Sequence, residues 1–401
     1  MQRNIEEVSS MGFEFLRVDR TGTGSEKWAV VPEHIRKSGS IPLSLADMEV
    51  ATAPAIIEAM EKAARHGVVG YTMPDGPYRE AVISWIQRRH GYTVAPEAIR
   101  CTFGVVAALN ICVRAFTQPG EGIIIQTPVY PPFHNAVRNN GRVLVENPLI
   151  NENGRYTMDY ADLERKAKDP NNKLLILCSP HNPAGRVWTE EELRRLGNIC
   201  RENGVLVLSD EIHFDLALRP DRPHHMFCSL GQAFADNAIV CTALSKTFNL
   251  AGLCCSNILI SNENLRKIYD AQVLVEGFDC IPYFAYAATI AAYTQCDAWY
   301  EALLDLIRDN NRVAEDLIRE RIPQAVVSPL EGTYLMWVDL TFLGLYGEEF
   351  DRFLAEDAGV WLDRGKKFGQ AGDGFVRINL ATQQSDVVDV IGRLADAIAA
   401  R

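Results

Sequence analysis

The chain has 401 residues, of which 47% are hydrophobic and 23% are charged, close to the average usage of globular proteins. This length predicts two or three domains with a sizeable core, and the net charge of −12 argues against a nucleic-acid partner. Apolar runs fall short of the ~20 residues that span a bilayer, residues 1–10 are polar, and the cysteines lack zinc-type pairing, so we expect a cytoplasmic protein without a membrane or metal partner.

Short apolar runs alternate with helical patterns through the middle of the chain. We predict strands at residues 123–126, 143–146, 174–178, 205–209 and 239–242. A helix is predicted over 189–203, where Thr189 and Glu192 have the spacing of a capping box. Alternation of strand and helix predicts a mainly parallel sheet that is covered on both faces, the α/β class.

The pattern changes after about residue 285. Helical stretches at 285–293 and 299–321 precede alternating segments at 332–340 and 374–380, which favours a smaller α+β domain. We therefore predict a large domain over 49–285 and a small C-terminal domain over 286–401. An N-terminal segment, 1–48, is predicted to join the small domain.

Lys246 follows the last predicted strand of the large domain, within Leu244-Ser245-Lys246-Thr247-Phe248-Asn249. A lysine at this place is costly to bury unless its amine is neutral or bound to another group. The chemistry that uses such a lysine is Schiff-base formation, above all with pyridoxal phosphate. A surface lysine after a strand is the alternative for this residue taken alone.

Other polar residues also follow predicted strands, where ligands bind in open α/β sheets. Asp210 is a candidate partner for a protonated pyridine nitrogen, and Asn182 for the phenolic oxygen of the cofactor ring. Tyr130 is a candidate to lie on the ring face, and His213 to act as a supporting group. Taken singly, each also has a structural interpretation: a helix cap for Asp210, a plain turn for Asn182, and packing for Tyr130 and His213.

Two further groups would be needed for this chemistry, a phosphate site and a carboxylate clamp. Gly104 stands at a predicted turn that opens a helix, and free N–H groups at a helix N-terminus bind phosphate. This single glycine is a weak signal without the other motifs. Arg377 lies within a predicted strand and suits bidentate binding of a substrate carboxylate, the alternative being an edge-strand arginine that points to solvent.

Several of these motifs resemble one family over nearly the whole chain. They look like the MalY/PatB group of pyridoxal-phosphate-dependent lyases, within the fold-type-I aminotransferase superfamily. The motifs are Arg20-Thr21-Gly22-Thr23 with Lys27-Trp28, Ala46-Asp47-Met48, Pro180-His181-Asn182-Pro183, Ser209-Asp210-Glu211-Ile212-His213, Ser245-Lys246-Thr247-Phe248-Asn249, Trp361-Leu362 and Phe375-Val376-Arg377.

The resemblance implies a set of roles. It implies Lys246 as the Schiff-base lysine, Asp210 on the ring nitrogen, Asn182 on the phenolic oxygen and Tyr130 stacked on the ring. Ser245 and His213 are assigned to the cofactor site, and the backbone of Gly104, Val105 and Val106 to the phosphate. Arg377, with Asn182, is implied to bind the substrate. Tyr71 is implied to reach the phosphate of a neighbouring subunit, which makes the active unit a homodimer.

The family resemblance implies β-elimination at the C–S bond of cystathionine, cysteine or related S-conjugates, giving pyruvate, ammonia and a thiol. An aminotransferase remains the main alternative, and a non-catalytic regulator a minor one. The chain also departs from the family pattern. It has Ala243 where a phosphate-binding serine is common, and Leu380-Ala381-Thr382-Gln383-Gln384 where a small residue and Pro-Arg often follow the asparagine. We expect this second departure near the mouth of the pocket.

Overall fold

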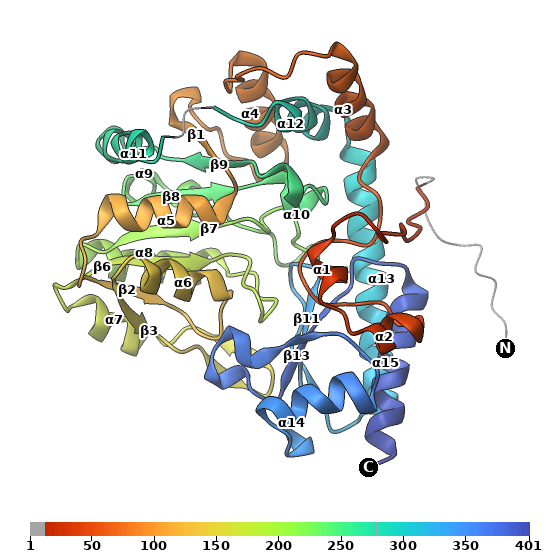
Figure 1. Cartoon of the computed structure of the whole chain (residues 1–401). Coiled ribbons are helices and arrows are strands. Elements are labelled where there is room, and N and C mark those ends of the chain that lie inside the picture. The colour runs from red at the N-terminus through yellow and green to blue at the C-terminus, as the bar shows by residue number, and fades with distance from the viewer. Residues whose placement is uncertain (1–12, 278–279) are drawn as a thin grey trace.

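The structure, a computed structural model, describes residues 13–277 and 280–401. A seven-stranded sheet and a four-stranded sheet organise the chain, with helices around both (Figure 1). Residues 1–12 of the predicted N-terminal segment lie outside the described residues.

The seven strands of the large sheet lie in the order β1-β9-β8-β7-β6-β2-β3. Their bounds are β1 Ile99–Thr102, β2 Gly122–Ile125, β3 Val143–Glu146, β6 Asn172–Cys178, β7 Leu206–Asp210, β8 Ala238–Thr242 and β9 Ser256–Leu259. Of these strands, β9 pairs in antiparallel fashion with β1 and β8, and the other pairs are parallel. The predicted mainly parallel sheet and its five predicted strands are confirmed, with small shifts at the strand ends.

The helices that surround the two sheets differ widely in length. Their bounds are α1 Glu26–Ala29, α2 Glu33–Lys37, α3 Pro54–His66, α4 Gly76–His90, α5 Val105–Phe116, α6 Pro131–Asn139, α7 Tyr160–Ala167, α8 Glu190–Glu202, α9 Gln232–Ala235, α10 Leu244–Thr247, α11 Glu263–Val275, α12 Tyr283–Gln295, α13 Asp297–Arg321, α14 Gly347–Arg352 and α15 Gln384–Ala399. The predicted helices at 189–203, 285–293 and 299–321 correspond to α8, α12 and α13.

Side chains of the central strands enter two separate cores on opposite faces of the large sheet. Ile123 and Ile125 of β2 pack with Leu109 of α5, and α5 lies in front of the sheet in Figure 1. Ile124, between them, belongs to the other core, together with Leu196 of α8. Successive side chains of a strand point to opposite faces, so a continuous apolar run is what a sheet covered on both sides requires.

Helix α8 begins with the predicted capping box. The Thr189 hydroxyl accepts from the N–H of Glu192 at 3.2 Å, and the Glu192 carboxylate accepts from the N–H of Thr189 at 2.8 Å. Both N–H groups would otherwise lack a partner at the start of the helix.

Replacement of this cap gives a stability prediction. We expect Thr189→Ala to lower the free energy of unfolding by about 1 kcal/mol, because one N–H at the helix start loses its acceptor. Urea unfolding of the variant and the parent measures the difference. Thr189→Ser keeps the hydroxyl and should stay close to the parent; an equal loss in both variants would mean that the methyl group, and not the cap, matters.

The small sheet contains β10 Val326–Val327, β11 Leu335–Asp339, β12 Asp363–Arg364 and β13 Phe375–Asn379, in the order β10-β11-β13-β12. All of its strand pairs are antiparallel. A separate hairpin is formed by β4 Ile150–Glu152 and β5 Arg155–Thr157. The predicted segments at 332–340 and 374–380 thus correspond to β11 and β13.

The described part of the N-terminal segment contacts the small sheet. Leu43 O accepts from the N–H of Asn379 at 2.9 Å, and the N–H of Leu45 donates to the Asp363 carboxylate at 3.1 Å. The predicted domain boundaries at residues 48 and 285 stay a prediction.

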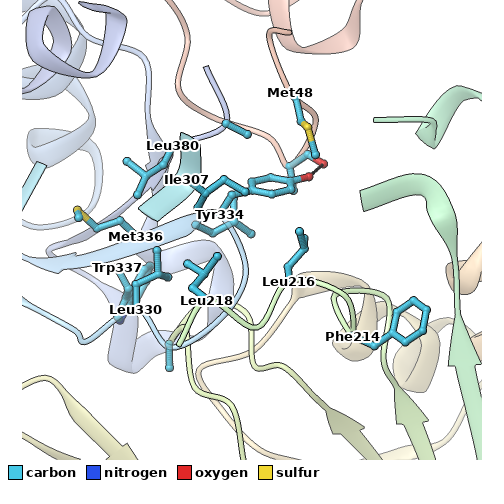
Figure 2. Packing of buried hydrophobic residues seen from close by; sticks show 14 of the residues in the cluster. Met48, Phe214, Leu216, Leu218, Ile307, Leu330, Tyr334, Met336, Trp337 and Leu380 are labelled. Carbon is cyan, nitrogen blue, oxygen red and sulfur yellow. Dashed lines mark hydrogen bonds between the residues drawn. The ribbon is translucent and has the colours of Figure 1, made fainter. Parts of the chain in front are cut away.

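A continuous apolar core lies where the large and small sheets meet. Leu216 and Leu218, on the chain that follows β7, face Tyr334 and Trp337 of the small-sheet region (Figure 2). Met48 of the N-terminal segment lies beside Tyr334 in the same view. This junction brings β13 and the N-terminal segment to the carboxyl ends of the large-sheet strands.

Among residues 13–277 and 280–401, no helix is long and apolar enough to cross a membrane. The same residues contain no cluster of three or more histidine, cysteine or acidic side chains arranged to hold a metal ion.

Candidate active site

One cavity of about 200 Å³ lies at the carboxyl ends of β6, β7 and β8. Its walls contain every predicted site residue except Tyr71 and Arg377, that is Gly104, Val105, Val106, Tyr130, Asn182, Asp210, His213, Ser245 and Lys246. These residues come from separate segments of the chain, so the fold brings together what the sequence had only placed after different strands.

Lys246 lies on α10, the short helix that follows β8, and its amine faces the cavity. The amine donates a hydrogen bond to the carbonyl oxygen of Ala46 at 2.5 Å. Burial, and next the positive charge of Arg377, lower the pKa of Lys246 to about 8. A lowered pKa increases the fraction of neutral amine near pH 7, and the neutral amine is the nucleophile and the base.

Asp210 ends β7 and is 3% exposed. One of its carboxylate oxygens accepts from the N–H of Ile212 at 3.1 Å, but it forms no ion pair with any described residue. Burial raises the pKa of Asp210 to about 7. A buried carboxylate of this kind fits a ligand that brings a protonated nitrogen, since a cation would return the pKa to a lower value.

The N-terminus of α5 forms an open cradle at the cavity. Gly104 precedes the helix with φ of 87°, a conformation that favours glycine, and an added Cβ would meet no heavy atom within 4 Å. No side chain caps this helix, so the N–H groups of Val105 and Val106 are available to an anion. Ala243, in place of the common serine, lies in the buried N-cap position of α10.

Arg377 lies in the middle of β13 and is 3% exposed, so it is not an edge residue that points to solvent. It donates to Asn182 Oδ1 at 2.8 Å and forms an ion pair with Asp363. Its Nε is buried and has no hydrogen-bond partner among the described residues. The guanidinium is therefore held in one orientation beside the cavity, and its Nε–H is among the three N–H groups left for a ligand.

Tyr130 and His213 also line the cavity. Burial, and next the charge of Asp210, raise the pKa of Tyr130 to about 12, so its hydroxyl stays protonated. His213 packs edge-on against Tyr334, with ring centroids 5.9 Å apart, and its Nδ1 has no partner among the described residues. Burial, and next the charges of Lys246 and Arg377, lower the pKa of His213 well below its usual value, so the ring is neutral.

Tyr71 is 99% exposed and lies outside the cavity. Its contact with the phosphate of a second subunit stays a prediction.

Sequence reasoning gave no individual role to several residues of the cavity wall. These are Ala46, Phe103, Cys178, Ile212, Ala251, Cys254 and Cys255. Ala46 acts through its backbone carbonyl, which no side-chain pattern reveals. The motif Ala46-Asp47-Met48, quoted above for the family resemblance, was the available signal.

Residues 380–384, expected near the pocket mouth, do not line this cavity. The carbonyl oxygens of Leu380 and Thr382 accept from the buried amide of Asn310, each at 2.8 Å, and the Ala381 carbonyl accepts from the N–H of Glu49 at 3.0 Å. The segment therefore packs against α13 and the N-terminal segment and is not part of the cavity wall, and its place at the pocket mouth stays a prediction.

The donor set of the cavity fits pyridoxal phosphate. Lys246 would hold its aldehyde carbon, Asp210 its ring nitrogen, Asn182 its ring oxygen, and the N-terminus of α5 its phosphate. The buried, unpaired Asp210 and the open space at Gly104 are the two structural features that this cofactor would complete. Fold and site thus define a protein of the fold-type-I, pyridoxal-phosphate class.

Comparisons with known proteins agree with this class. The model of the family described as aminotransferase class I and II matches residues 39–394. Cystathionine beta-lyase PatB of Bacillus subtilis is 40% identical over 382 residues, 95% of this chain and 98% of that protein. Protein MalY of Escherichia coli is 31% identical over 391 residues, 97% and 99% of the two chains. The crystal structure of cystalysin from Treponema denticola, which contains pyridoxal 5'-phosphate, has a TM-score of 0.92 and 37% identity, covering 97% of this chain and 99% of that one.

The chain belongs to the aminotransferase class I and II family and, within it, to the MalY/PatB group that its motifs resemble.

Proposed function

We propose that the protein is a pyridoxal-phosphate-dependent carbon–sulfur lyase. It cleaves the C–S bond of cystathionine, cysteine or a related S-conjugate by β-elimination, and it releases a thiol, pyruvate and ammonia. The observation that supports the cofactor chemistry is the single cavity that holds the Lys246 amine, the buried Asp210 carboxylate and the α5 cradle. The choice of C–S elimination is supported by relatives named cystathionine beta-lyase and by the neighbouring cystalysin.

Bound pyridoxal phosphate supplies an aldehyde that links to amines and a ring that withdraws electrons from the Cα of an amino acid. The residues of the chain do the rest. Lys246, as a neutral amine, takes the Cα proton, which its lowered pKa favours. Asp210 keeps a proton on the ring nitrogen, and Arg377 orients the substrate carboxylate. The thiolate on Cβ then leaves, and water completes the release of pyruvate and ammonia.

A substrate panel tests this function directly. We expect the purified protein, incubated with cystathionine, cysteine and S-alkylcysteines, to form pyruvate and thiol in equal amounts. A parallel reaction with an amino acid and a 2-oxo acid tests transamination. Amino-group transfer without pyruvate from any sulfur substrate would refute the lyase proposal and favour an aminotransferase. A protein that binds the cofactor but does neither would indicate a regulator.

Replacement of Arg377 tests its predicted role in binding the substrate carboxylate. We expect Arg377→Lys to raise KM about 10²-fold and to change kcat less, because an ammonium group cannot form the bidentate pair with a carboxylate. Steady-state kinetics on one sulfur substrate measures both parameters. Arg364→Lys, a neighbouring arginine that pairs with Asp351 on the protein surface, serves as the control. An unchanged KM in Arg377→Lys would mean that another group binds the carboxylate.

We further propose a cytoplasmic homodimer with shared active sites. Large apolar side chains are exposed around Tyr71, where Val68, Val69 and Met73 are each more than 60% exposed. Such a group of exposed apolar residues is typical of an interface. Light scattering of the purified protein measures its mass in solution, and a monomer with full activity would refute the shared site. In a dimer, Tyr71→Phe should weaken cofactor binding.

A further inference from the structure

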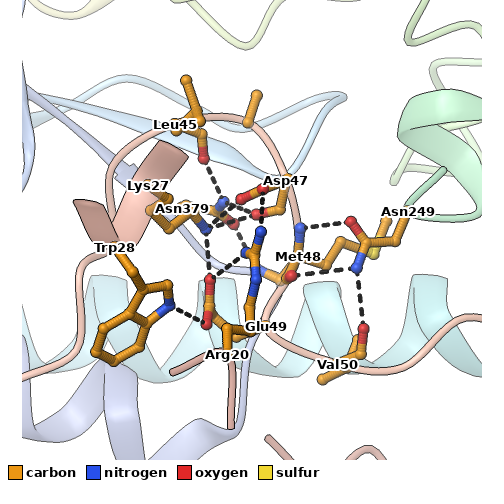
Figure 3. A network of polar contacts seen from close by, with 12 residues as sticks. Arg20, Lys27, Trp28, Leu45, Asp47, Met48, Glu49, Val50, Asn249 and Asn379 are labelled. Atoms are coloured by element: carbon orange, nitrogen blue, oxygen red, sulfur yellow. Dashed lines mark hydrogen bonds and ion pairs between the residues drawn. The ribbon is translucent and has the colours of Figure 1, made fainter. Parts of the chain in front are cut away.

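A largely buried ion network in the N-terminal segment lies next to the peptide that contacts the active-site lysine. Its members are Arg20, Lys27, Asp47 and Glu49, two cations and two anions (Figure 3). Arg20 and Lys27 lie in the motif Arg20 to Trp28, Asp47 lies in the motif Ala46 to Met48, and Glu49 follows directly; none of the four side chains has a part in the proposed chemistry. Lys27 is only 1% exposed, which is unusual for a lysine away from the reacting atoms.

The ion pairs are tight and mutually supporting. The Lys27 amine lies 2.8 Å from the Asp47 carboxylate and 2.9 Å from that of Glu49, and it donates to the Asp47 carbonyl at 2.7 Å. Arg20 spans the same two carboxylates at 2.8 and 3.0 Å. Trp28 donates to the second oxygen of Glu49 at 3.0 Å. Buried charges are stable only when they are paired in this way.

Two asparagines fix the backbone of the same segment. Asn379, at the end of β13, donates to the carbonyls of Leu45 and Asp47 at 2.8 and 2.7 Å. Asn249, three residues after Lys246, exchanges hydrogen bonds with the N–H and the carbonyl of Met48 at 2.9 and 3.1 Å (Figure 3). The segment is thus tied on one side to the small sheet and on the other to the turn that carries Lys246.

Ala46 lies between these anchors. Its carbonyl oxygen accepts from the Lys246 amine at 2.5 Å and from the Tyr334 hydroxyl at 2.9 Å. Since Asp47 is the next residue, the ion network holds the peptide that contacts the amine.

We propose that the network of Arg20, Lys27, Asp47 and Glu49 is a positioning device for Lys246. It fixes the Ala46 carbonyl against the free amine, and it places one carboxylate and one ammonium group beside that amine. The effect of the network on catalysis rests on the proposed function, whereas its effect on the position of the Lys246 amine does not. The network would hold Lys246 in place whenever the lysine is not covalently bound.

The charges that act on the Lys246 amine come from the N-terminal segment, β7 and β13. Arg377 on β13 and Lys27 lower its pKa, whereas Asp47 and Asp210 on β7 raise it; His213 is neutral. Removal of Lys27 should therefore raise the pKa of Lys246, and removal of the Asp47 charge should lower it. We expect each shift to be about 0.5–1 pH unit, as for charges a short distance apart in a protein interior.

Competitive labelling of the cofactor-free full chain tests this. Lys246 is labelled with acetic anhydride over a range of pH, and mass spectrometry of its peptide gives the midpoint. We expect Lys27→Met to move the midpoint up and Asp47→Asn to move it down. Trp28→Phe removes one hydrogen bond but no charge, and should leave the midpoint unchanged. Shifts of both charge variants in one direction, or no shift in a variant that is folded by circular dichroism, would overturn the proposal.

The remaining outcomes are also decisive. If Lys27→Met does not fold, Asp47→Asn, which keeps the shape of the side chain, decides the question by itself. Its labelling midpoint should then lie below that of the parent.

In the cofactor-loaded enzyme, Lys27→Met should lower kcat about tenfold with little change in KM, because the base and not the substrate is displaced. A change in KM alone would contradict a role in positioning Lys246. If the parent releases no pyruvate, the proposed function fails while the labelling result still decides this inference.

Discussion

Lys246→Ala is expected to lower the rate of pyruvate release by at least about 10⁴-fold, because the variant loses both the covalent anchor and the base. It should also lose the covalent link to the cofactor. After borohydride reduction, mass spectrometry of the peptide with Lys246 should find the cofactor mass in the parent and not in the variant.

Lys62→Ala provides the matched control for this experiment. Lys62 is an exposed lysine on α3, away from the cavity. Its replacement should leave both pyruvate release and covalent labelling at the level of the parent. Cofactor still attached after reduction of Lys246→Ala would show that another lysine carries it, and the central assignment would then be wrong.

Asp210→Asn is expected to have opposite effects on activity and on stability. Activity should fall by about 10²–10³-fold, because the amide cannot hold a proton on the ring nitrogen as a carboxylate does. The cofactor-free variant should nevertheless be more stable than the cofactor-free parent at pH 8. Kinetics of the loaded enzyme and urea unfolding of the cofactor-free protein measure the two effects.

The sign of the stability effect follows from the pKa of Asp210. In the folded protein this pKa is about 7, against a usual value of 3.8, so the folded state binds the proton more tightly than the unfolded state. Stability therefore falls as pH rises from about 4 to about 7, and the loss is complete above the folded pKa. The difference of about three pKa units, at about 1.36 kcal/mol each, lowers the free energy of unfolding of the parent by about 4 kcal/mol at pH 8. The neutral asparagine has no such loss.

Near pH 3.5 the aspartic acid is largely neutral in both states, so Asp210→Asn and the parent should have similar stability there. Asp357→Asn, at an exposed position, serves as the control and should leave the stability of the parent nearly unchanged. If Asp210→Asn and the parent were equally stable at pH 8 as well as at pH 3.5, another group would have to neutralise the Asp210 charge in the cofactor-free protein.

The sequence predicted five of the seven strands of the large sheet and missed the two at one end, β1 and β9. Strands β2, β6, β7 and β8 are buried on both faces and appear as apolar runs. Strands β1 and β9 were not predicted, because β1 contains Arg100 and Thr102, and β9 contains Ser256 and Asn257, which interrupt the apolar pattern. In the fold these polar side chains are paired: Thr102 with Ser256 at 2.6 Å, and Arg100 with Asp270 on α11. Such partners are distant in the chain and cannot be inferred from a local pattern.

The site was predictable where chemistry is carried by side chains. Lys246, Asp210 and Asn182 follow buried strands, and the order of parallel strands forces them to one edge of the sheet. The contribution of Ala46 was not predictable, because it is made by a backbone carbonyl. The pairing of Arg377 with Asp363 likewise depends on the register of β12 and β13, which the sequence does not specify.

The segment around Ala46 also bears on when the protein can first become functional during its synthesis. The hydrogen bonds of Asn379 join it to residues 334 and 332 positions earlier in the chain. A nascent chain that has made the Lys246 turn but not yet β13 lacks this anchor. Cofactor capture by the ribosome-bound chain should therefore be inefficient until β13 has emerged from the exit tunnel.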